Sequence, residues 1–336
     1  MKVAVFNTKT YDEEYLGRAN MRDGQPQHQI EFLKLHLQEK TAVLAKGAEA
    51  VCCFVNDHLD RPVLQILAEQ GTRLIVMRCS GFNNIDLKAA HELGIRILRV
   101  PAYSPYAVAE HAMALMFSLC RHLPRAHNRV RDGNFSLKGL MGFDIHGKTI
   151  GIIGMGAIGK VLCQMFSGFG SDVLGYDPYP NEEFKPEYFS YVDLEDVMQK
   201  SDIIFLNCPL TEDTHHLVNT ETIAQMKDHV MIINTSRGGL IDTPAVIEGL
   251  KEGKIGALGI DVYEEEGDLF FEDLSDNIIK DDVFMRLLTF RNVQVTGHQA
   301  FFTHEAMNKI TQTTIQNLTD FEAGQVNTAN EVIYKN

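Results

Sequence analysis

Several features that define particular classes of protein are absent from this sequence of 336 residues. It contains no tryptophan, no HExxH motif and no CxxC motif. Its six cysteines lie mostly inside apolar runs, which is typical of small buried thiols in a reducing compartment. The adjacent His215 and His216 are poorly placed to bind one ion together, so the sequence predicts no metal site.

Positive charge is also scarce. The sequence has 31 lysines and arginines against 45 aspartates and glutamates, which gives a net charge of −14, and no basic stretch offsets this excess. These values argue against nucleic acid or an anionic membrane as a partner. One arginine in a small cleft could still bind an anionic metabolite, so a small-molecule substrate remains open.

Long hydrophobic runs are missing too. The apolar segment 107–119 carries Glu110 and His111 and is too short to span a bilayer. The N-terminus opens on the strand-like KVAVF (2–6) rather than on a basic region followed by a long apolar stretch. We therefore expect a cytosolic protein.

What is present is an alternation of strand-like and helix-like segments in two parts, and the length suits two domains. The first part, to about residue 100, has the strand-like runs KVAVF, HQIEFLKLHL, AVCCFV, TRLIVM and IRIL. Two helix-like segments between them end at Gly71 and Gly94, as helices with a left-handed C-terminal glycine do. The two prolines of VPAYSP (100–105) predict a hinge before an apolar helix from Tyr106 to about His122.

The second part has six strand candidates: TIGIIG, DVLGYD, DIIFLNC, VMIINTS, ALGIDV and NVQVTG. Helical segments alternate with them, which predicts a Rossmann-type parallel sheet. The stretch 301–321 is helix-like and could return to the first part. The predicted fold is α/β, with two Rossmann-like, doubly wound parallel-sheet domains separated by a cleft. One is discontinuous and flavodoxin-like (1–101 plus 300–336), and the other covers 102–299.

A glycine-rich loop lies between the first strand and the first helix of the second part. Gly154, Gly156 and Gly159 form a GxGxxG pattern in this context, where glycines permit a tight turn and close approach of a pyrophosphate to a helix N-terminus. Asp177 ends the next strand, about 20 residues on, where a carboxylate accepts hydrogen bonds from both ribose hydroxyls and repels a 2′-phosphate. The sequence therefore predicts NAD(H) rather than NADP(H).

Three polar residues, Arg237, Glu266 and His298, each follow a strand-like run. Each alone would more often be a surface ion-pair residue or a loop histidine. Open parallel sheets bind ligands beyond the carboxyl ends of their strands, so all three can meet in one site. Beside a nicotinamide, Arg237 can hold a substrate carboxylate and polarise the carbonyl, His298 can exchange the proton, and Glu266 can favour the protonated ring and orient it.

Six segments carry a resemblance to a known family: RCSGFNNIDL (78–87), VPAYSPYAVAEHA (100–112), GMGAIGK (154–160), NTSRGGLID (234–242), DVYEEEGDLFFEDLSD (261–276) and TGHQAFFT (296–303). Over essentially the whole chain the sequence resembles the D-isomer-specific 2-hydroxyacid dehydrogenases, and in particular their fermentative D-lactate-forming members. The resemblance implies a cytosolic homo-oligomer, a dimer or tetramer, that reduces pyruvate to D-lactate with NADH. The discontinuous domain would bind the substrate and the other domain NAD.

The resemblance also implies roles for individual residues. Arg237 becomes the carboxylate anchor, His298 the acid/base and Glu266 its partner. The remaining contacts would be Ala157 and Ile158 with the pyrophosphate, Asp177 with the ribose, Cys208, Pro209 and Thr214 on the adenine side, Thr235, Ser236, Arg237 and Asp261 near the nicotinamide, and Ser80, Gly81, Tyr103 and Phe301 around the substrate. Tyr103 could instead be hinge packing, and Phe301 a core residue.

Other interpretations stay open at this stage. The substrate could be 2-oxoisocaproate, phenylpyruvate or hydroxypyruvate, because one methylene in an apolar pocket is worth about 1–3 kcal/mol of discrimination. A protein of this fold could also be an NAD(H)-sensing corepressor-like binding module. Met113, Met116 and Leu119 have helical spacing on the apolar helix, which could be a subunit interface or an ordinary core helix.

Overall fold

The computed structural model describes residues 1–334 and divides the chain into two compact units. Unit 1 contains Met1–Ser104 and the chain from Phe302 onward, and unit 2 is Pro105–Phe301. The divisions predicted after residues 101 and 299 lie close to these positions. The C-terminal helix belongs to unit 1, so that unit is built from both ends of the chain.

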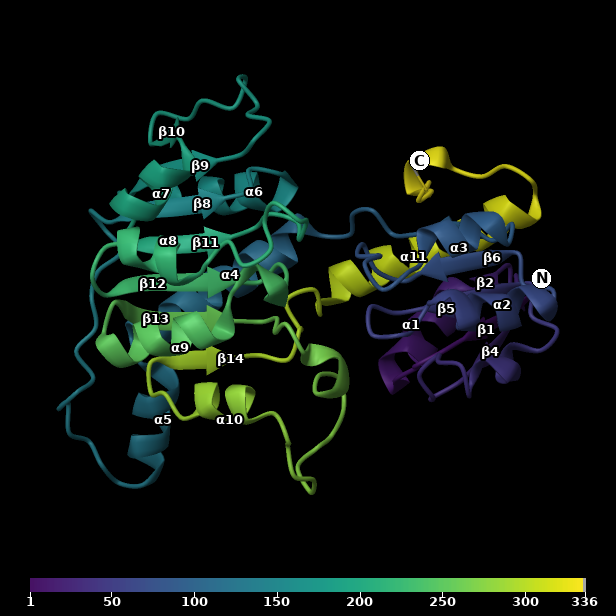
Figure 1. Cartoon of the computed structure of the whole chain (residues 1–336), viewed down its shortest axis with the longest axis horizontal. Coiled ribbons are helices and arrows are strands. Elements are labelled where there is room, and N and C mark those ends of the chain that lie inside the picture. The colour runs from purple at the N-terminus through teal and green to yellow at the C-terminus, as the bar shows by residue number, and fades with distance from the viewer. Residues whose placement is uncertain (335–336) are drawn as a thin grey trace. The chain divides into compact units, whose positions relative to one another are not determined.

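Unit 1 is a five-stranded parallel sheet in the order β4-β1-β5-β6-β7, which is the flavodoxin-like order (Figure 1). All four residues of β5 and of β6 are buried, as expected for central strands of a parallel sheet that is covered on both faces. The strands are β1 (Lys2–Val5), β4 (Gln29–Phe32), β5 (Ala50–Cys53), β6 (Leu74–Met77) and β7 (Arg96–Leu98), and β2 (Met21–Arg22) and β3 (Gln25–Pro26) form a small hairpin.

The helices of unit 1 are α1 (Thr10–Ala19), α2 (Arg61–Glu69), α3 (Leu87–Glu92) and α11 (His304–Glu322), with 3-10 turns η1 (Ala42–Ala45) and η4 (Thr328–Asn330). α2 begins at an Asp60 N-cap, whose carboxylate accepts a hydrogen bond from the Val63 N–H. Gly71 and Gly94 follow α2 and α3 with φ of 96° and 69°, which confirms the predicted left-handed glycines. α11 buries Ile315 and Leu318 in the same core as the strands.

Unit 2 is a seven-stranded parallel sheet in the order β10-β9-β8-β11-β12-β13-β14. This is the Rossmann order 3-2-1-4-5-6 with one further strand at the end. The strands are β8 (Thr149–Ile153), β9 (Asp172–Tyr176), β10 (Phe189–Tyr191), β11 (Ile203–Leu206), β12 (Val230–Asn234), β13 (Ile255–Ile260) and β14 (Val293–Val295). All six predicted strands are present, and the three-residue β10 is an addition.

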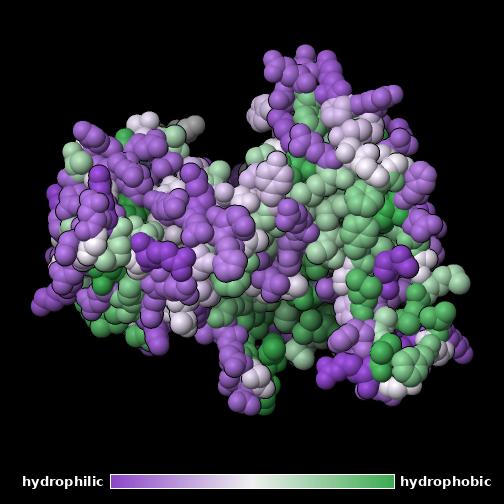
Figure 2. All heavy atoms as spheres, turned by 180° about the vertical axis from the view of Figure 1, so that it is seen from behind, coloured by the Kyte–Doolittle hydropathy of each residue, from purple (hydrophilic) through white to green (hydrophobic). Residues whose placement is uncertain are grey.

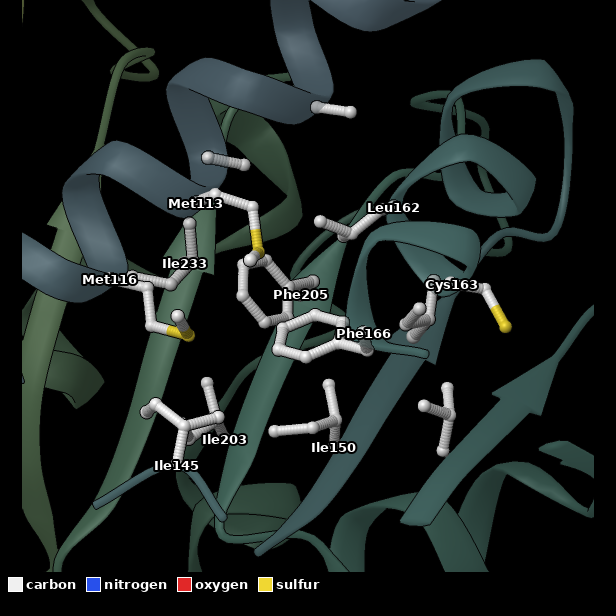
Figure 3. Packing of buried hydrophobic residues seen from close by; sticks show 14 of the residues in the cluster. Met113, Met116, Ile145, Ile150, Leu162, Cys163, Phe166, Ile203, Phe205 and Ile233 are labelled. Carbon is white, nitrogen blue, oxygen red and sulfur yellow. The ribbon is translucent and has the colours of Figure 1, made fainter. Parts of the chain in front are cut away.

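The helices of unit 2 are α4 (Pro105–Cys120), α5 (Leu123–Arg131), α6 (Ala157–Phe166), α7 (Leu194–Lys200), α8 (Thr220–Gln225), α9 (Thr243–Glu252) and α10 (Asp282–Leu288), with 3-10 turns η2 (Gly238–Leu240) and η3 (Glu266–Asp268). α4 is a core helix. Met113 and Met116 point toward Phe205 and Ile233 of the sheet (Figure 3), and Leu119 belongs to the same buried cluster. Of the two alternatives, the core helix therefore holds for these three side chains, because they are already covered within the unit.

Two further expectations concern the whole described chain. All six cysteines are free and buried, which confirms the interpretation of their apolar surroundings. Among the described residues, no helix has both the length and the apolar character needed to cross a membrane.

Candidate active site

The glycine-rich loop has a conformation that suits a pyrophosphate. Gly154 has a φ of 97°, and a Cβ built there would lie 2.6 Å from the backbone of Asn207. Gly156, just before α6, has open space where a Cβ would lie, while a Cβ at Gly159 would collide with the Gly154 carbonyl oxygen. The three glycines thus serve the turn, the approach of a ligand and the packing of helix on strand, as the predicted dinucleotide fingerprint requires.

Asp177 lies at the end of β9, next to this loop. Its carboxylate accepts hydrogen bonds from the N–H of Met155 (2.9 Å) and from the N–H of Tyr179 (2.9 Å). These two bonds hold both oxygens at the edge of the fingerprint loop. A carboxylate oxygen can accept more than one hydrogen bond, so Asp177 keeps capacity for the two hydroxyls of a ribose.

Asp177→Ser is expected to weaken NADH binding about 30- to 150-fold, the effect of losing a charged hydrogen-bond acceptor worth about 2–3 kcal/mol. NADPH binding should weaken less or improve, because the repulsion of the 2′-phosphate disappears. The measurement is KM for both cofactors. Asp177→Asn is the matched control, since it keeps the shape and removes the charge. An unchanged ratio of the two KM values would show that Asp177 does not select the cofactor.

The adenine-side residues predicted from the resemblance follow β11. Burial raises the pKa of the Cys208 thiol to about 11, so this thiol is neutral near pH 7. The Thr214 hydroxyl donates to the Pro209 carbonyl (2.7 Å) and accepts from the N–H of Thr211 (2.8 Å), and so it closes its own loop. Their contact with adenine stays a prediction.

Asn207 is a candidate that sequence reasoning missed. It follows β11 beside β8, where the strand order reverses, and parallel sheets bind ligands at that point. Within the described part of the chain, its buried side-chain amide nitrogen has no hydrogen-bond partner. The signal in the sequence was a lone amide at the end of the apolar run IIFLN. An unpaired buried donor at this position fits a bound dinucleotide phosphate or ribose.

The predicted trio follows three neighbouring strands, β12, β13 and β14, at the same edge of the sheet. His298 Nδ1 lies 2.7 Å from Glu266 Oε1, and the two side chains are 17% and 21% exposed. The other Glu266 oxygen accepts a hydrogen bond from the N–H of Tyr263 (2.9 Å). Glu266 is thus fixed at both oxygens and orients the ring, which directs Nε2 to proton exchange.

Asp261, at the end of β13, holds the loop that carries His298. The Asp261 backbone carbonyl accepts from the His298 N–H (2.7 Å), and its carboxylate accepts from the N–H groups of Gln299 (2.9 Å) and Ala300 (2.8 Å). His298 itself has a φ of 52°, a conformation that a non-glycine residue rarely adopts. The buried carboxylate therefore stabilises a strained backbone at the candidate acid/base.

The charge state of Asp261 follows from the same contacts. Burial alone would raise its pKa, but hydrogen bonds from His111 and Thr296 and from the amides of Ala300 and Gln299 more than offset this, and the pKa lies below its usual value. The Asp261 side chain is fully buried. Its predicted place near the nicotinamide stays a prediction.

Asp261→Asn is expected to lower the free energy of unfolding by about 1–3 kcal/mol, because the new amide would face N–H groups that need an acceptor. A carboxyl whose pKa is lowered in the folded state stabilises the protein at pH values above the ordinary aspartate pKa, and this stabilisation is lost as the pH falls through the folded-state pKa. The difference in free energy of unfolding between the variant and the wild type should thus be full above about pH 4 and shrink as the pH falls further. Chemical denaturation at several pH values measures this. An equal difference at all pH values would contradict the assignment of charge.

Arg237 lies between β12 and η2, in the loop that packs on the Glu266 loop. A Cβ at Gly238 would collide with the backbone of Tyr263 and Glu264, so the glycine permits this close approach. The Arg237 guanidinium donates a hydrogen bond to the Ser236 carbonyl (2.6 Å), and the Arg237 backbone carbonyl accepts one from the Asn234 side chain (2.8 Å). Arg237 is therefore held beside the loop that orients His298.

Thr235 and Ser236 lie in the same loop as Arg237. Thr235 is buried, and the Ser236 hydroxyl donates to the Cys208 carbonyl (2.6 Å). This bond ties the loop after β12 to the loop after β11. The predicted contact of both residues with the nicotinamide is untested.

Two phenylalanines flank the histidine. The Phe301 ring centroid lies 6.5 Å from that of His298, edge to face, and the Phe301 side chain is buried. The Phe271 ring lies 5.6 Å away, from a residue with a φ of 69°. Sequence reasoning named Phe301 and missed Phe271. Phe271 belongs to the short apolar segment LFF, which lies between acidic residues in GDLFFED.

The other predicted substrate residues belong to unit 1. Ser80 and Gly81 follow β6, at the carboxyl edge of that sheet, and the Ser80 carbonyl accepts from the Arg99 guanidinium (2.7 Å). Tyr103 lies just before the division between the units. Their part in substrate binding stays a prediction.

Comparison with known proteins decides the family. The family model described as D-isomer specific 2-hydroxyacid dehydrogenase, NAD binding domain, matches residues 113–300. The chain belongs to this dehydrogenase family. The dehydrogenase is 53% identical over 325 residues to the D-lactate dehydrogenase of Escherichia coli K12. The aligned region covers 97% of this chain and 98% of that protein.

Solved structures agree with this assignment. The apo-structure of D-lactate dehydrogenase from Escherichia coli matches with a TM-score of 0.88 and 50% identity, over 99% of this chain and 100% of that one. A structure of D-2-hydroxyisocaproate dehydrogenase matches with a TM-score of 0.85 and 32% identity, over 99% and 100%. The predicted fold class is confirmed, as are the enzyme class and NAD as cofactor. Unit 2 contains the family's NAD-binding domain.

Proposed function

We propose that this dehydrogenase reduces pyruvate to D-lactate with NADH, reversibly. The observation that carries the proposal is the His298–Glu266 pair at 2.7 Å, in a loop next to that of Arg237 and in the domain with the dinucleotide fingerprint. A paired imidazole and a fixed guanidinium are the groups that reduction of a 2-oxo acid requires. Relatives about half identical to this chain bear the name D-lactate dehydrogenase.

The roles follow from the chemistry of each side chain. NADH, when bound, supplies the hydride to the 2-oxo carbon. Arg237 binds the substrate carboxylate through two parallel hydrogen bonds and polarises the carbonyl. His298 donates its Nε2 proton to the carbonyl oxygen, and Glu266 stabilises the protonated ring before transfer. In the reverse direction, neutral His298 accepts the hydroxyl proton of D-lactate.

We further propose that the discontinuous unit 1 is the substrate-binding domain and contacts the substrate through Ser80, Gly81 and Tyr103. The aromatic rings near His298 favour a small 2-oxo acid, because Phe271 and Phe301 already fill space beside the ring. The alternative is a larger substrate such as 2-oxoisocaproate, which the 32% identical D-2-hydroxyisocaproate dehydrogenase makes worth testing.

The test is oxidation of NADH, followed by its absorbance, with pyruvate, 2-oxoisocaproate, phenylpyruvate and hydroxypyruvate. We expect the highest kcat/KM with pyruvate, and D-lactate rather than L-lactate as the product. A higher kcat/KM with another 2-oxo acid would reassign the substrate. A flat trace with all four would favour an NAD(H)-sensing binding module instead.

We also propose a homo-oligomer, a dimer or tetramer. Large apolar side chains are exposed along α5 and the segment after it: Leu123, Val130, Phe135, Leu137 and Met141. Hydrophobic atoms gather at the lower end of unit 2 in Figure 2, where α5 and this segment lie. Such patches are typical of protein contacts. Light scattering on the purified chain measures the mass, and a monomer at all concentrations would contradict the proposal.

A cytosolic location is part of the same proposal. Six free, buried cysteines support a reducing compartment.

A further inference from the structure

Three potential metal ligands meet on unit 2, two in the loop after β11 and one in the loop after β13. The rings of His215 and His216 stack with centroids 3.8 Å apart and planes 22° apart. His215 Nε2 lies 3.3 Å from Glu264 Oε1, and His216 Nε2 lies 3.1 Å from each Glu264 oxygen. The two histidines, which were expected to be poorly placed for joint ligation, thus both approach the Oε1 atom of Glu264. His216 has a φ of 50°, and this left-handed backbone places both rings on one side.

The separations suit a tetrahedral ion. Ligand atoms about 2.0–2.2 Å from zinc stand roughly 3.3–3.5 Å from one another in a tetrahedron. The two distances to Glu264 Oε1 are close to this edge length, and all three ligand atoms lie within 4.8 Å of one another. Because a metal–nitrogen bond lies in the plane of its imidazole, the two stacked rings turn apart when an ion binds. Two imidazoles and one carboxylate favour zinc and similar divalent transition ions over magnesium or calcium.

The backbone around the cluster is fixed before any ion binds. The His216 N–H donates to the Gly239 carbonyl (2.8 Å), and the Asn219 side chain donates to the His216 carbonyl (2.9 Å). A fixed backbone leaves only the side chains to be ordered on binding, which raises affinity.

We propose that His215, His216 and Glu264 form a zinc-type metal site that ties the loop after β11 to the loop after β13. The His215 and Glu264 side chains are 52% and 31% exposed, so an ion can enter from solvent. Three protein ligands leave a fourth position for water. Because Glu264 precedes Glu266 by two residues, a bound ion would also order the segment that holds the acid/base partner. The inference does not depend on the substrate of the enzyme.

The test is calorimetric titration of the full-length, chelator-treated protein with zinc chloride, together with its thermal midpoint. We expect one ion per chain at saturation. At zinc a hundredfold above Kd, the midpoint should rise by roughly 5–10 °C. His215→Gln and Glu264→Gln should each weaken binding at least about tenfold, since each removes one of three ligands.

The matched control is His127→Gln, an exposed histidine on α5, which should bind zinc as the wild type does. His215→Gln is the decisive variant because its half-exposed ring leaves the fold intact, and an unchanged midpoint without zinc verifies this. Equal zinc binding by wild type and His215→Gln would overturn the proposal. So would the absence of saturable binding, since the three side chains would then form a hydrogen-bonded cluster alone.

Discussion

His298→Ala is expected to lower kcat for pyruvate reduction about 10³-fold, while the Kd for NADH changes about twofold or less. The variant removes the proton donor, so the developing alkoxide would have to take its proton from water. The fingerprint loop and Asp177, which hold the cofactor, are untouched. Steady-state kinetics give kcat, and fluorescence titration gives the Kd.

Glu266→Gln tests the same pair. The Glu266 carboxylate lies 2.7 Å from His298 Nδ1 and orients the ring. A hydrogen bond to a charged group is worth about 1.5–3 kcal/mol, so kcat for pyruvate should fall about 10- to 100-fold while the Kd for NADH is kept. His127→Ala is the control and should match the wild type. Unchanged turnover of His298→Ala would end the assignment of the acid/base, and unchanged turnover of Glu266→Gln would leave Glu266 with a structural role alone.

Arg237→Lys is expected to reduce kcat/KM for pyruvate about 10- to 150-fold, although the charge is kept. Lysine cannot form the two parallel hydrogen bonds that a guanidinium makes with a carboxylate. Losing one hydrogen bond to a charged group costs about 1.5–3 kcal/mol. The loss should appear mainly in KM, and in the affinity for oxamate, a pyruvate analogue that cannot be reduced.

The control for this variant is Arg286→Lys, on the exposed side of α10, which should leave kcat/KM unchanged. Wild-type affinity of Arg237→Lys for oxamate would contradict a carboxylate clamp. A variant with normal oxamate binding and low kcat would move Arg237 from substrate binding to polarisation of the carbonyl.

The central strands and the fingerprint could be predicted because their signals are local. Four to six apolar residues in a row specify a buried parallel strand such as β5 or β12, and three glycines at fixed spacing specify the turn. α1 was missed because its sequence TYDEEYLGRA buries few apolar residues. β10 was missed because three residues are too few to show the alternation of apolar and polar side chains that indicates a strand.

Pairing between distant residues is what the sequence could not provide. Glu266 and His298 were expected in one site, but the bond between them depends on β13 and β14 being neighbours. Asp261 was named for the cofactor, whereas its bonds to the His298 loop became visible in the structure alone. The His215–His216 arrangement depends on one left-handed residue, and although histidine adopts this conformation more often than most residues, the sequence does not show which histidine does so.

The two-part construction of unit 1 has a consequence for synthesis on the ribosome. Its N-terminal strands emerge first, but α11, which completes their core with Ile315 and Leu318, emerges last. Unit 2 is continuous in the sequence and can fold while unit 1 still lacks this helix. The nascent first unit must therefore keep an apolar face open until the chain is almost finished, and during that time the enzyme is most exposed to aggregation.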